Sequence, residues 1–107
     1  MMFTRDELIN ATGAVVLRDS LDNDASMFNI STDTRTIKAE DIYLPLKGES
    51  FDGEKFIVKA IEAGAKAYFT TNDTLIEGAD LVLKVDNTLT AYLNIAKYYR
   101  TKINPIT

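Results

Sequence analysis

The chain of 107 residues carries a net charge of −4, is 46% hydrophobic and 26% charged, and contains neither cysteine nor histidine. This length suits one domain with a single hydrophobic core, and the acidic balance argues against nucleic acid or an anionic membrane as the main partner. The missing residue types exclude disulfides, thiolate chemistry, an imidazole general base and a His-ligated zinc site.

No apolar run approaches the ~20 residues of a membrane span, and the start of the chain lacks the basic region and apolar core of a signal peptide. We therefore expect a soluble, cytoplasmic protein that binds neither nucleic acid nor membranes. No group of carboxylates has metal-ligand spacing, so no metal site is predicted. A small anionic ligand remains compatible with the composition, because a few local cations and backbone N–H groups suffice to bind it.

The first predicted element is a helix over residues 5–12. Thr4 can cap this helix, and Glu7, three residues further on, completes a capping box. Gly13 supplies a residue that readily ends a helix. The local sequence therefore predicts both ends of the helix.

Five short apolar runs are typical of β-strands. We expect parallel pairing between the last two runs. Pro45 has no N–H for a sheet ladder, so its strand should lie at an edge or end at that residue. The predicted strands cover 14–17, 27–32, 41–48, 65–71 and 80–85.

Two further helices are predicted from apolar residues at helical spacing. One covers 53–63 with Asp52 as its N-cap, and the other covers 89–100 with Asn87 or Thr88 as its cap. Strands that alternate with helices predict a small single α/β domain, in which a mixed sheet of short strands packs against helices. The predicted core contains Val15, Val16, Phe28, Ile30, Ile42, Leu44, Phe56, Ile57, Ile61, Phe69, Val82, Leu83, Leu93 and Tyr99.

The polar cluster STDTR lies at the end of the second predicted strand. Its hydroxyls, carboxylate and guanidinium can hold a polar ligand through short, directional hydrogen bonds. The same residue types also form ordinary Asx or ST turns, with Arg35 paired to Asp33 or Asp41, and local sequence alone favours that interpretation. The cluster consists of Ser31, Thr32, Asp33, Thr34 and Arg35.

A second cluster lies in LPLKGESFDGEKF, at a junction between a strand and a helix. Lys47 and Gly48 leave the strand, whereas Asp52 and Gly53 enter a helix whose free N–H groups would favour an anion. Neither a P-loop nor a GxGxxG pattern is present. A connecting loop with a helix cap explains the same residues without any ligand.

Together the two clusters resemble the N-terminal domain of the Mur ligases, which build the peptidoglycan stem peptide. The family pattern has a (S/T)-D-(S/T)-R turn, a G-D-(I/L)-F strand, an LKG and an F-D-G-H-x-F-I helix start. Similarity is loose at the strand, where EDIY has Glu40 and Tyr43 in place of the family's Gly and Phe. It is weaker along the rest of the chain. The matching segments are 32–35, 40–43, 46–48 and 51–57.

The resemblance implies the first of three domains of an ATP-dependent ligase, one that holds the uridine-diphosphate end of UDP-N-acetylmuramoyl-tripeptide. ATP and Mg²⁺ would serve the parent enzyme, and this chain alone would need no cofactor, carry no catalytic residue and be inactive. Its further partners would be the central and C-terminal domains. The ending KINPIT is expected to mark a chain cut at a domain boundary. By position, Ser31, Thr32, Asp33, Thr34 and Arg35 match the turn at the uracil and ribose, and Lys47, Gly48, Phe51, Asp52 and Gly53 match the loop beside the nucleotide and its diphosphate.

Glu54 departs from the family, which usually has His after F-D-G. A carboxylate beside a diphosphate is unfavourable, so we expect its side chain to face solvent or to be compensated by Lys55.

Two alternatives remain. Within the family, TDTR and LPLKGE favour the ligase that adds D-alanyl-D-alanine over the one that adds lysine or diaminopimelate at the third position of the stem peptide. From a different class, the chain could be a non-catalytic protein-interaction module whose two loops are merely turns.

Overall fold

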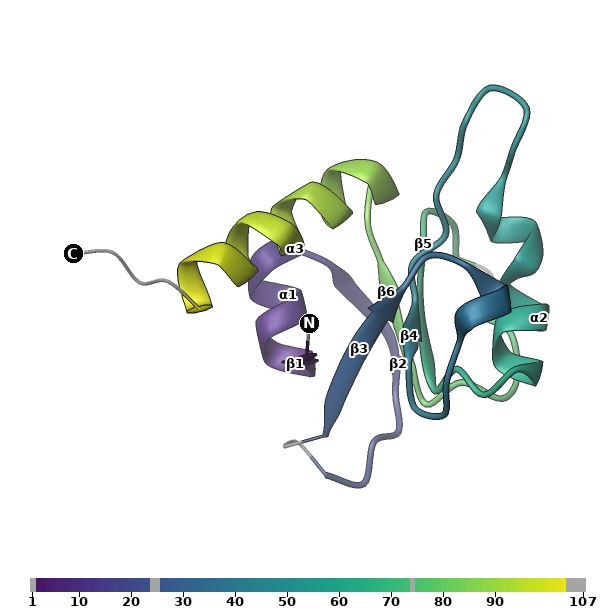
Figure 1. Cartoon of the computed structure of the whole chain (residues 1–107). Coiled ribbons are helices and arrows are strands. Elements are labelled where there is room, and N and C mark those ends of the chain that lie inside the picture. Colours follow the sequence, from purple (N-terminus) through teal and green to yellow (C-terminus); the bar gives the residue numbers. More distant parts are fainter. Residues whose placement is uncertain (1, 24–25, 74, 104–107) are drawn as a thin grey trace.

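The computed structural model describes residues 2–23, 26–73 and 75–103, which form a small α/β domain around one mixed sheet (Figure 1). The strand order is β1-β3-β4-β5-β6-β2. The segment KINPIT, interpreted above as a domain boundary, falls mostly on residues outside the described ones. The elements are β1 (Met2–Thr4), α1 (Arg5–Thr12), β2 (Val15–Asp19), β3 (Met27–Ser31), the 3₁₀ helix η1 (Thr34–Thr36), β4 (Ile42–Tyr43), the 3₁₀ helix η2 (Gly53–Phe56), α2 (Ile57–Glu62), β5 (Ala67–Thr70), β6 (Leu81–Lys84) and α3 (Thr88–Ile103).

The four central strands of the sheet are parallel, and both edge strands are antiparallel. β3, β4, β5 and β6 pair in that order, which confirms the predicted parallel pairing of the last two strands. β1 joins β3 at one edge and β2 joins β6 at the other. β1 was not predicted from the sequence, whereas the expected fold class is confirmed.

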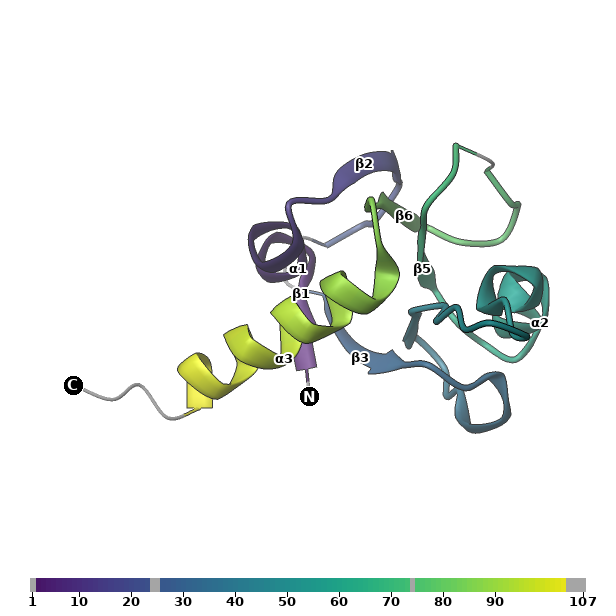
Figure 2. The same ribbon diagram turned by 90° about the horizontal axis from the view of Figure 1, so that it is seen from above.

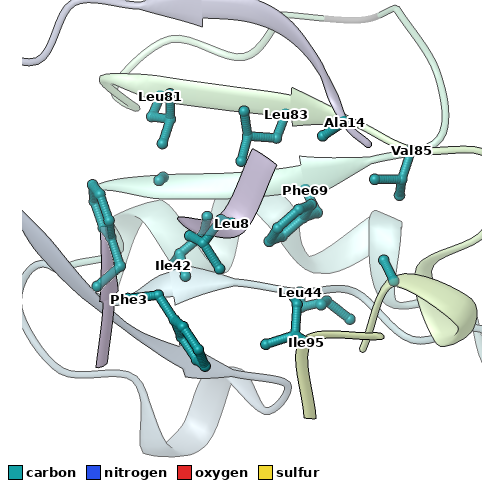
Figure 3. Packing of buried hydrophobic residues seen from close by; sticks show 13 residues of the cluster. Phe3, Leu8, Ala14, Ile42, Leu44, Phe69, Leu81, Leu83, Val85 and Ile95 are labelled. Atoms are coloured by element: carbon teal, nitrogen blue, oxygen red, sulfur yellow. The ribbon is translucent and has the colours of Figure 1, made fainter. Parts of the chain in front are cut away.

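Helices cover both faces of the sheet. In Figure 2, α1 and α3 lie on one side of the strands and α2 lies on the other. Because side chains alternate along a strand, Ile42 and Leu44 join the cluster under α1 and α3, whereas Tyr43 joins the cluster under α2. Figure 3 shows the first cluster, in which Leu8 of α1 and Ile95 of α3 lie over the strand residues. The central strands are therefore buried on both faces, as parallel sheets usually are.

The predicted ends of α1 are confirmed. The Thr4 hydroxyl accepts a hydrogen bond from the Glu7 backbone N–H, and the Glu7 carboxylate accepts one from the Thr4 N–H. Gly13 ends the helix with a φ of 71°. Glu7 also accepts hydrogen bonds from Tyr98 and Lys102, which fastens α1 to α3. The Thr4 backbone N–H is the largest cause that lowers the pKa of Glu7.

Part of the predicted core is wrong. Val15 is 60% exposed and Val16 also faces solvent, because β2 is an edge strand with one neighbour. Leu93 is 57% exposed, since α3 turns Ala91 and Ile95 toward the sheet. The other predicted core residues are buried (Phe28, Ile42, Leu44, Ile57, Phe69, Val82 and Leu83) or partly buried (Ile30, Phe56, Ile61 and Tyr99).

Two predicted elements differ from the observed ones, the first in length and the second in its type of helix. The strand predicted over 41–48 is reduced to β4, which lies between β3 and β5, so Pro45 follows the end of a central strand. The helix predicted over 53–63 begins as η2 and continues as α2. Across the described ranges, no helix combines the length and apolarity needed to cross a membrane.

Ile57→Ala should lower the free energy of unfolding by about 2–5 kcal/mol, because Ile57 is 3% exposed and truncation leaves a cavity beneath α2. Chemical denaturation would measure the change. Leu93→Ala is the matched control and should stay within about 0.5 kcal/mol of the unmodified protein. Equal losses in the two variants would contradict the burial described for α2.

Candidate nucleotide site

Two loops follow the carboxyl ends of neighbouring strands and bring the two polar clusters near each other. The STDTR turn follows the carboxyl end of β3, and a longer loop follows the carboxyl end of β4. β3 and β4 are parallel neighbours, so both loops begin on the same side of the sheet. Ligands of open α/β sheets commonly bind at this edge.

Asp33 organises the STDTR turn. Its carboxylate accepts hydrogen bonds from the Arg35 backbone N–H at 2.8 Å and from Arg35 Nη2 at 2.7 Å. Its carbonyl oxygen accepts hydrogen bonds from the hydroxyls of Ser31 and Thr36. The pairing of Arg35 with Asp33, expected for an ordinary turn, is therefore present. Asp41 instead accepts from the backbone N–H of residue 38.

The hydroxyls of Thr32 and Thr34 differ from those of Ser31 and Thr36. Neither threonine hydroxyl makes a hydrogen bond within the part of the chain that the structure describes, and both residues are only partly exposed. The turn thus holds itself together through Asp33 and leaves two hydroxyls available to a ligand.

The guanidinium of Arg35 keeps Asp33 ionised. Hydrogen bonds from the Arg35 side chain, followed by the one from its backbone, lower the pKa of Asp33 from 3.8 to about 2. The same contact raises the pKa of Arg35. At neutral pH, the charges of these two side chains compensate each other.

The loop after β4 is a small hairpin that projects beyond the sheet in Figure 1. Lys47 and Asp52 form an antiparallel bridge, and the Gly48 N–H donates to the Phe51 carbonyl at 2.7 Å. The Asp52 carboxylate accepts from the Glu54 N–H, as expected of an N-cap. Four residues at the tip are exposed: Gly48, Glu49, Ser50 and Phe51.

The close packing of the loop against Leu46 requires a glycine at position 53. Its N–H donates to the Leu46 carbonyl at 2.8 Å, and its own carbonyl accepts from the Tyr43 hydroxyl at 2.9 Å. A Cβ at this position would lie 2.6 Å from the Leu46 oxygen. The expectation that the helix offers free N–H groups to an anion is therefore wrong at residues 53 and 54, where both groups already have acceptors.

Glu54 also differs from the expectation that it faces solvent or is compensated by Lys55. Its carboxylate accepts hydrogen bonds from the hydroxyls of Thr70 and Thr71. It also accepts from the Thr71 backbone N–H and from the Asn72 side-chain amide. These contacts fasten η2 to the carboxyl end of β5.

The STDTR turn and the hairpin share the walls of a pocket of about 430 Å³, which we call the aromatic pocket. Phe51 and Phe56 stack in it, with ring centroids 5.6 Å apart and an interplanar angle of 15°. Phe51 is 49% exposed, so part of the ring is open to a ligand. The lining residues are Thr32, Asp33, Thr34, Arg35, Tyr43, Phe51, Phe56 and Lys59.

A neighbouring pocket of about 240 Å³, the hairpin pocket, shares Phe51 with the aromatic pocket. It is lined by Lys47, Gly48, Glu49, Ser50, Phe51, Asp52 and Lys55. Of the predicted site residues, Thr32, Asp33, Thr34, Arg35 and Phe51 line the aromatic pocket, Lys47, Gly48, Phe51 and Asp52 line the hairpin pocket, and Ser31 and Gly53 line neither.

Three residues of the aromatic pocket were missed in the sequence analysis: Tyr43, Phe56 and Lys59. Phe56 was assigned only to the core, although it stacks on Phe51 five residues earlier. The spacing of Phe56 and Lys59 at i and i+3 on a helix was the available signal, because such residues lie on one face.

A larger pocket, of about 540 Å³, lies between β2, β6 and the start of α3. Its cation, Lys84, is paired with Asp73 at 2.7 Å, and Asp86 adds a further negative charge. The charge of Lys84 is therefore already compensated within this pocket. Within the described residues, no group of acidic, His or Cys side chains could hold a metal ion.

Gly53→Ala should destabilise the protein by about 1–3 kcal/mol, because the new methyl group overlaps the Leu46 carbonyl. Gly48→Ala is the control, since a Cβ there meets nothing within 4 Å. Thermal unfolding of both variants would measure the difference. Equal melting temperatures would contradict the close backbone contact.

The Asp33 carboxyl should titrate near pH 2 in the folded protein, which NMR can follow through its side-chain carbon. Because its folded pKa is depressed, the pair with Arg35 contributes fully above pH 3.8 and is lost as the pH falls through about 2. Arg35→Gln should move the midpoint up toward 3.8. A midpoint that does not move in this variant would contradict the proposed cause.

Comparison with known proteins shows the family of the chain. The family model described as "Mur ligase family, catalytic domain" matches residues 27–101. The chain is 42% identical over 86 residues to UDP-N-acetylmuramoyl-tripeptide–D-alanyl-D-alanine ligase of Synechocystis sp., which covers 78% of this chain and 18% of the relative. The Haemophilus influenzae (strain ATCC 51907) protein of the same name is 34% identical, over 80% of this chain and 19% of its own length.

Solved structures show the same fold. MurF from Acinetobacter baumannii (crystal structure II) superposes with a TM-score of 0.80 and 25% identity, over 95% of this chain and 22% of that one. The chain thus spans about a fifth of the length of these relatives. A family match over most of the sequence, with relatives that are more than 30% identical over most of it, shows that this chain belongs to the Mur ligase family and is most like the ligase that adds D-alanyl-D-alanine.

Proposed function

We propose that this domain holds the UDP part of UDP-N-acetylmuramoyl-tripeptide for an ATP-dependent ligase that adds D-alanyl-D-alanine to the peptidoglycan precursor. The names of the most similar relatives support the substrate class. The observation that carries the proposal is the aromatic pocket, which combines free hydroxyls with an exposed aromatic ring at the carboxyl edge of the sheet.

The uridine occupies the aromatic pocket in this proposal. A planar base gains from stacking on an aromatic side chain, and Phe51 offers a partly exposed ring at the mouth of the pocket. The hydroxyls of Thr32 and Thr34, which have no hydrogen-bond partner within the described ranges, can donate to and accept from the base or the ribose. Asp33 and Arg35 fix the turn that carries these hydroxyls.

The diphosphate extends over Phe51 into the hairpin pocket. Lys47 and Lys55 both line that pocket, and an ammonium group is a suitable partner for phosphate. Gly48 has open space around it, so a phosphate can approach its backbone closely. Because Gly53 is already packed against Leu46, we assign its role to the shape of the loop and not to the ligand.

ATP and Mg²⁺ belong to other parts of the ligase in this proposal. A MurF ligase from Thermotoga maritima, solved in complex with ADP, resembles this chain with a TM-score of 0.57 over 17% of its own length. The cytoplasmic location and the contacts with further domains are part of the same proposal.

The ligase that adds diaminopimelate remains the second candidate. A relative of that name from Haemophilus influenzae is 28% identical over 73% of this chain, and one from Clostridium tetani is 55% identical over 38 residues. An assay of the complete ligase separates the two: product from the UDP-linked tripeptide and D-alanyl-D-alanine supports the first candidate. Product from the UDP-linked dipeptide and diaminopimelate supports the second.

A two-dimensional NMR titration with UDP-N-acetylmuramic acid tests the site. We expect a Kd on the order of 0.1–1 mM, about 4–5.5 kcal/mol, because one domain makes only part of the contacts. Shifts should concentrate in residues 31–35 and 46–54. Thr34→Val should weaken binding by about 1–2 kcal/mol with little change in stability, since it removes a hydroxyl that has no hydrogen-bond partner among the residues that the structure describes.

Thr90→Val, an exposed threonine of α3 outside both pockets of the proposed site, is the matched control and should bind like the unmodified domain. Saturating ligand that moves no resonance in either loop would leave the two clusters as ordinary turns.

A further inference from the structure

Lys59 is the cation of the aromatic pocket that has no anionic partner among the described residues. Its ammonium lies 5.9 Å from the centre of the Phe56 ring, and the residue is exposed on α2. Arg35, the other cation of this pocket, is held by Asp33. The charge that the pocket can offer to a ligand therefore comes from Lys59.

The position of Lys59 restricts which group it can meet. Phe51 and Phe56 form a nearly parallel aromatic stack, so a planar ring that lies along this wall turns its edge toward neighbouring side chains. The ammonium lies over the Phe56 ring of the same stack, 5.9 Å from the ring centroid. It can donate hydrogen bonds but cannot accept them. Lys59 is thus suited to a ring edge that carries a carbonyl oxygen.

We propose that Lys59 donates a hydrogen bond to the carbonyl oxygen at ring position 4 of the nucleobase and makes the pocket selective for uracil over cytosine. Uracil has a carbonyl at ring position 4, where cytosine has an amino group, and two donors facing each other leave both without a partner. This inference rests on the proposed function, since it requires the base to occupy the aromatic pocket.

Lys55 provides a matched control for Lys59. It is a lysine one helical turn earlier, it is exposed, and it lines the hairpin pocket instead of the aromatic pocket. Replacing either lysine by methionine keeps a long apolar stem and removes the charge. The two variants therefore separate an effect on the base from an effect on the phosphates.

The test is an NMR titration of the domain and of Lys59→Met and Lys55→Met with uridine monophosphate and cytidine monophosphate. The unmodified domain should prefer the uridine nucleotide. Lys59→Met should weaken uridine monophosphate about 5- to 10-fold and cytidine monophosphate less than about 2-fold, so that the preference disappears. Lys55→Met should keep the preference.

Three outcomes would overturn the inference. If Lys59→Met binds both nucleotides as tightly as the unmodified domain and keeps the preference for uracil, another residue contacts the base. If it weakens both nucleotides equally, Lys59 meets the phosphate instead. Both results leave the proposed function intact, provided that the shifts lie in residues 31–35 and 46–54. Shifts elsewhere, or none, would overturn the proposed function together with this inference.

Discussion

The contact between Gly53 and Leu46 fixes the geometry on which the candidate site depends. It joins the two ends of the hairpin through the Gly53 N–H and the Leu46 carbonyl, with no room for a side chain. The Tyr43 hydroxyl holds the other side of the same glycine and connects it to the end of β4. Phe51 lies just before this point and Phe56 just after it, so their stacking follows from where the loop is pinned.

Local signals in the sequence predicted local structure well. The box of Thr4 and Glu7 is formed by groups three residues apart, so no distant contact was needed to foresee α1. β1 was missed for the opposite reason, since Met2–Thr4 becomes a strand only by pairing with β3, more than twenty residues away. Val15 and Leu93 were misplaced because an apolar pattern identifies a face, and only the final packing decides whether that face is covered.

The same distinction applies to the site. The STDTR and hairpin residues could be selected from a family pattern, and the structure brings most of them to two adjoining pockets. Tyr43 could not be selected, because it lines the aromatic pocket only after β4 is placed against the loops, whereas for Lys59 the sequence offered only its helical spacing from Phe56. Gly53 is the opposite case. The family pattern predicted a ligand contact for this residue, but its backbone N–H and carbonyl both make hydrogen bonds within the protein.

The contacts of Glu54 connect residue 54 to the segment 70–72, so substitutions at one should affect the other. A carboxylate only accepts hydrogen bonds, and here the donors come from three successive residues, Thr70, Thr71 and Asn72. If histidine replaced Glu54, its neutral ring would offer a single acceptor nitrogen, so most of these donors would lose their acceptor. Residue 54 and the segment 70–72 should therefore co-vary among descendants of this sequence, so that acceptors at one position are retained together with donors at the other.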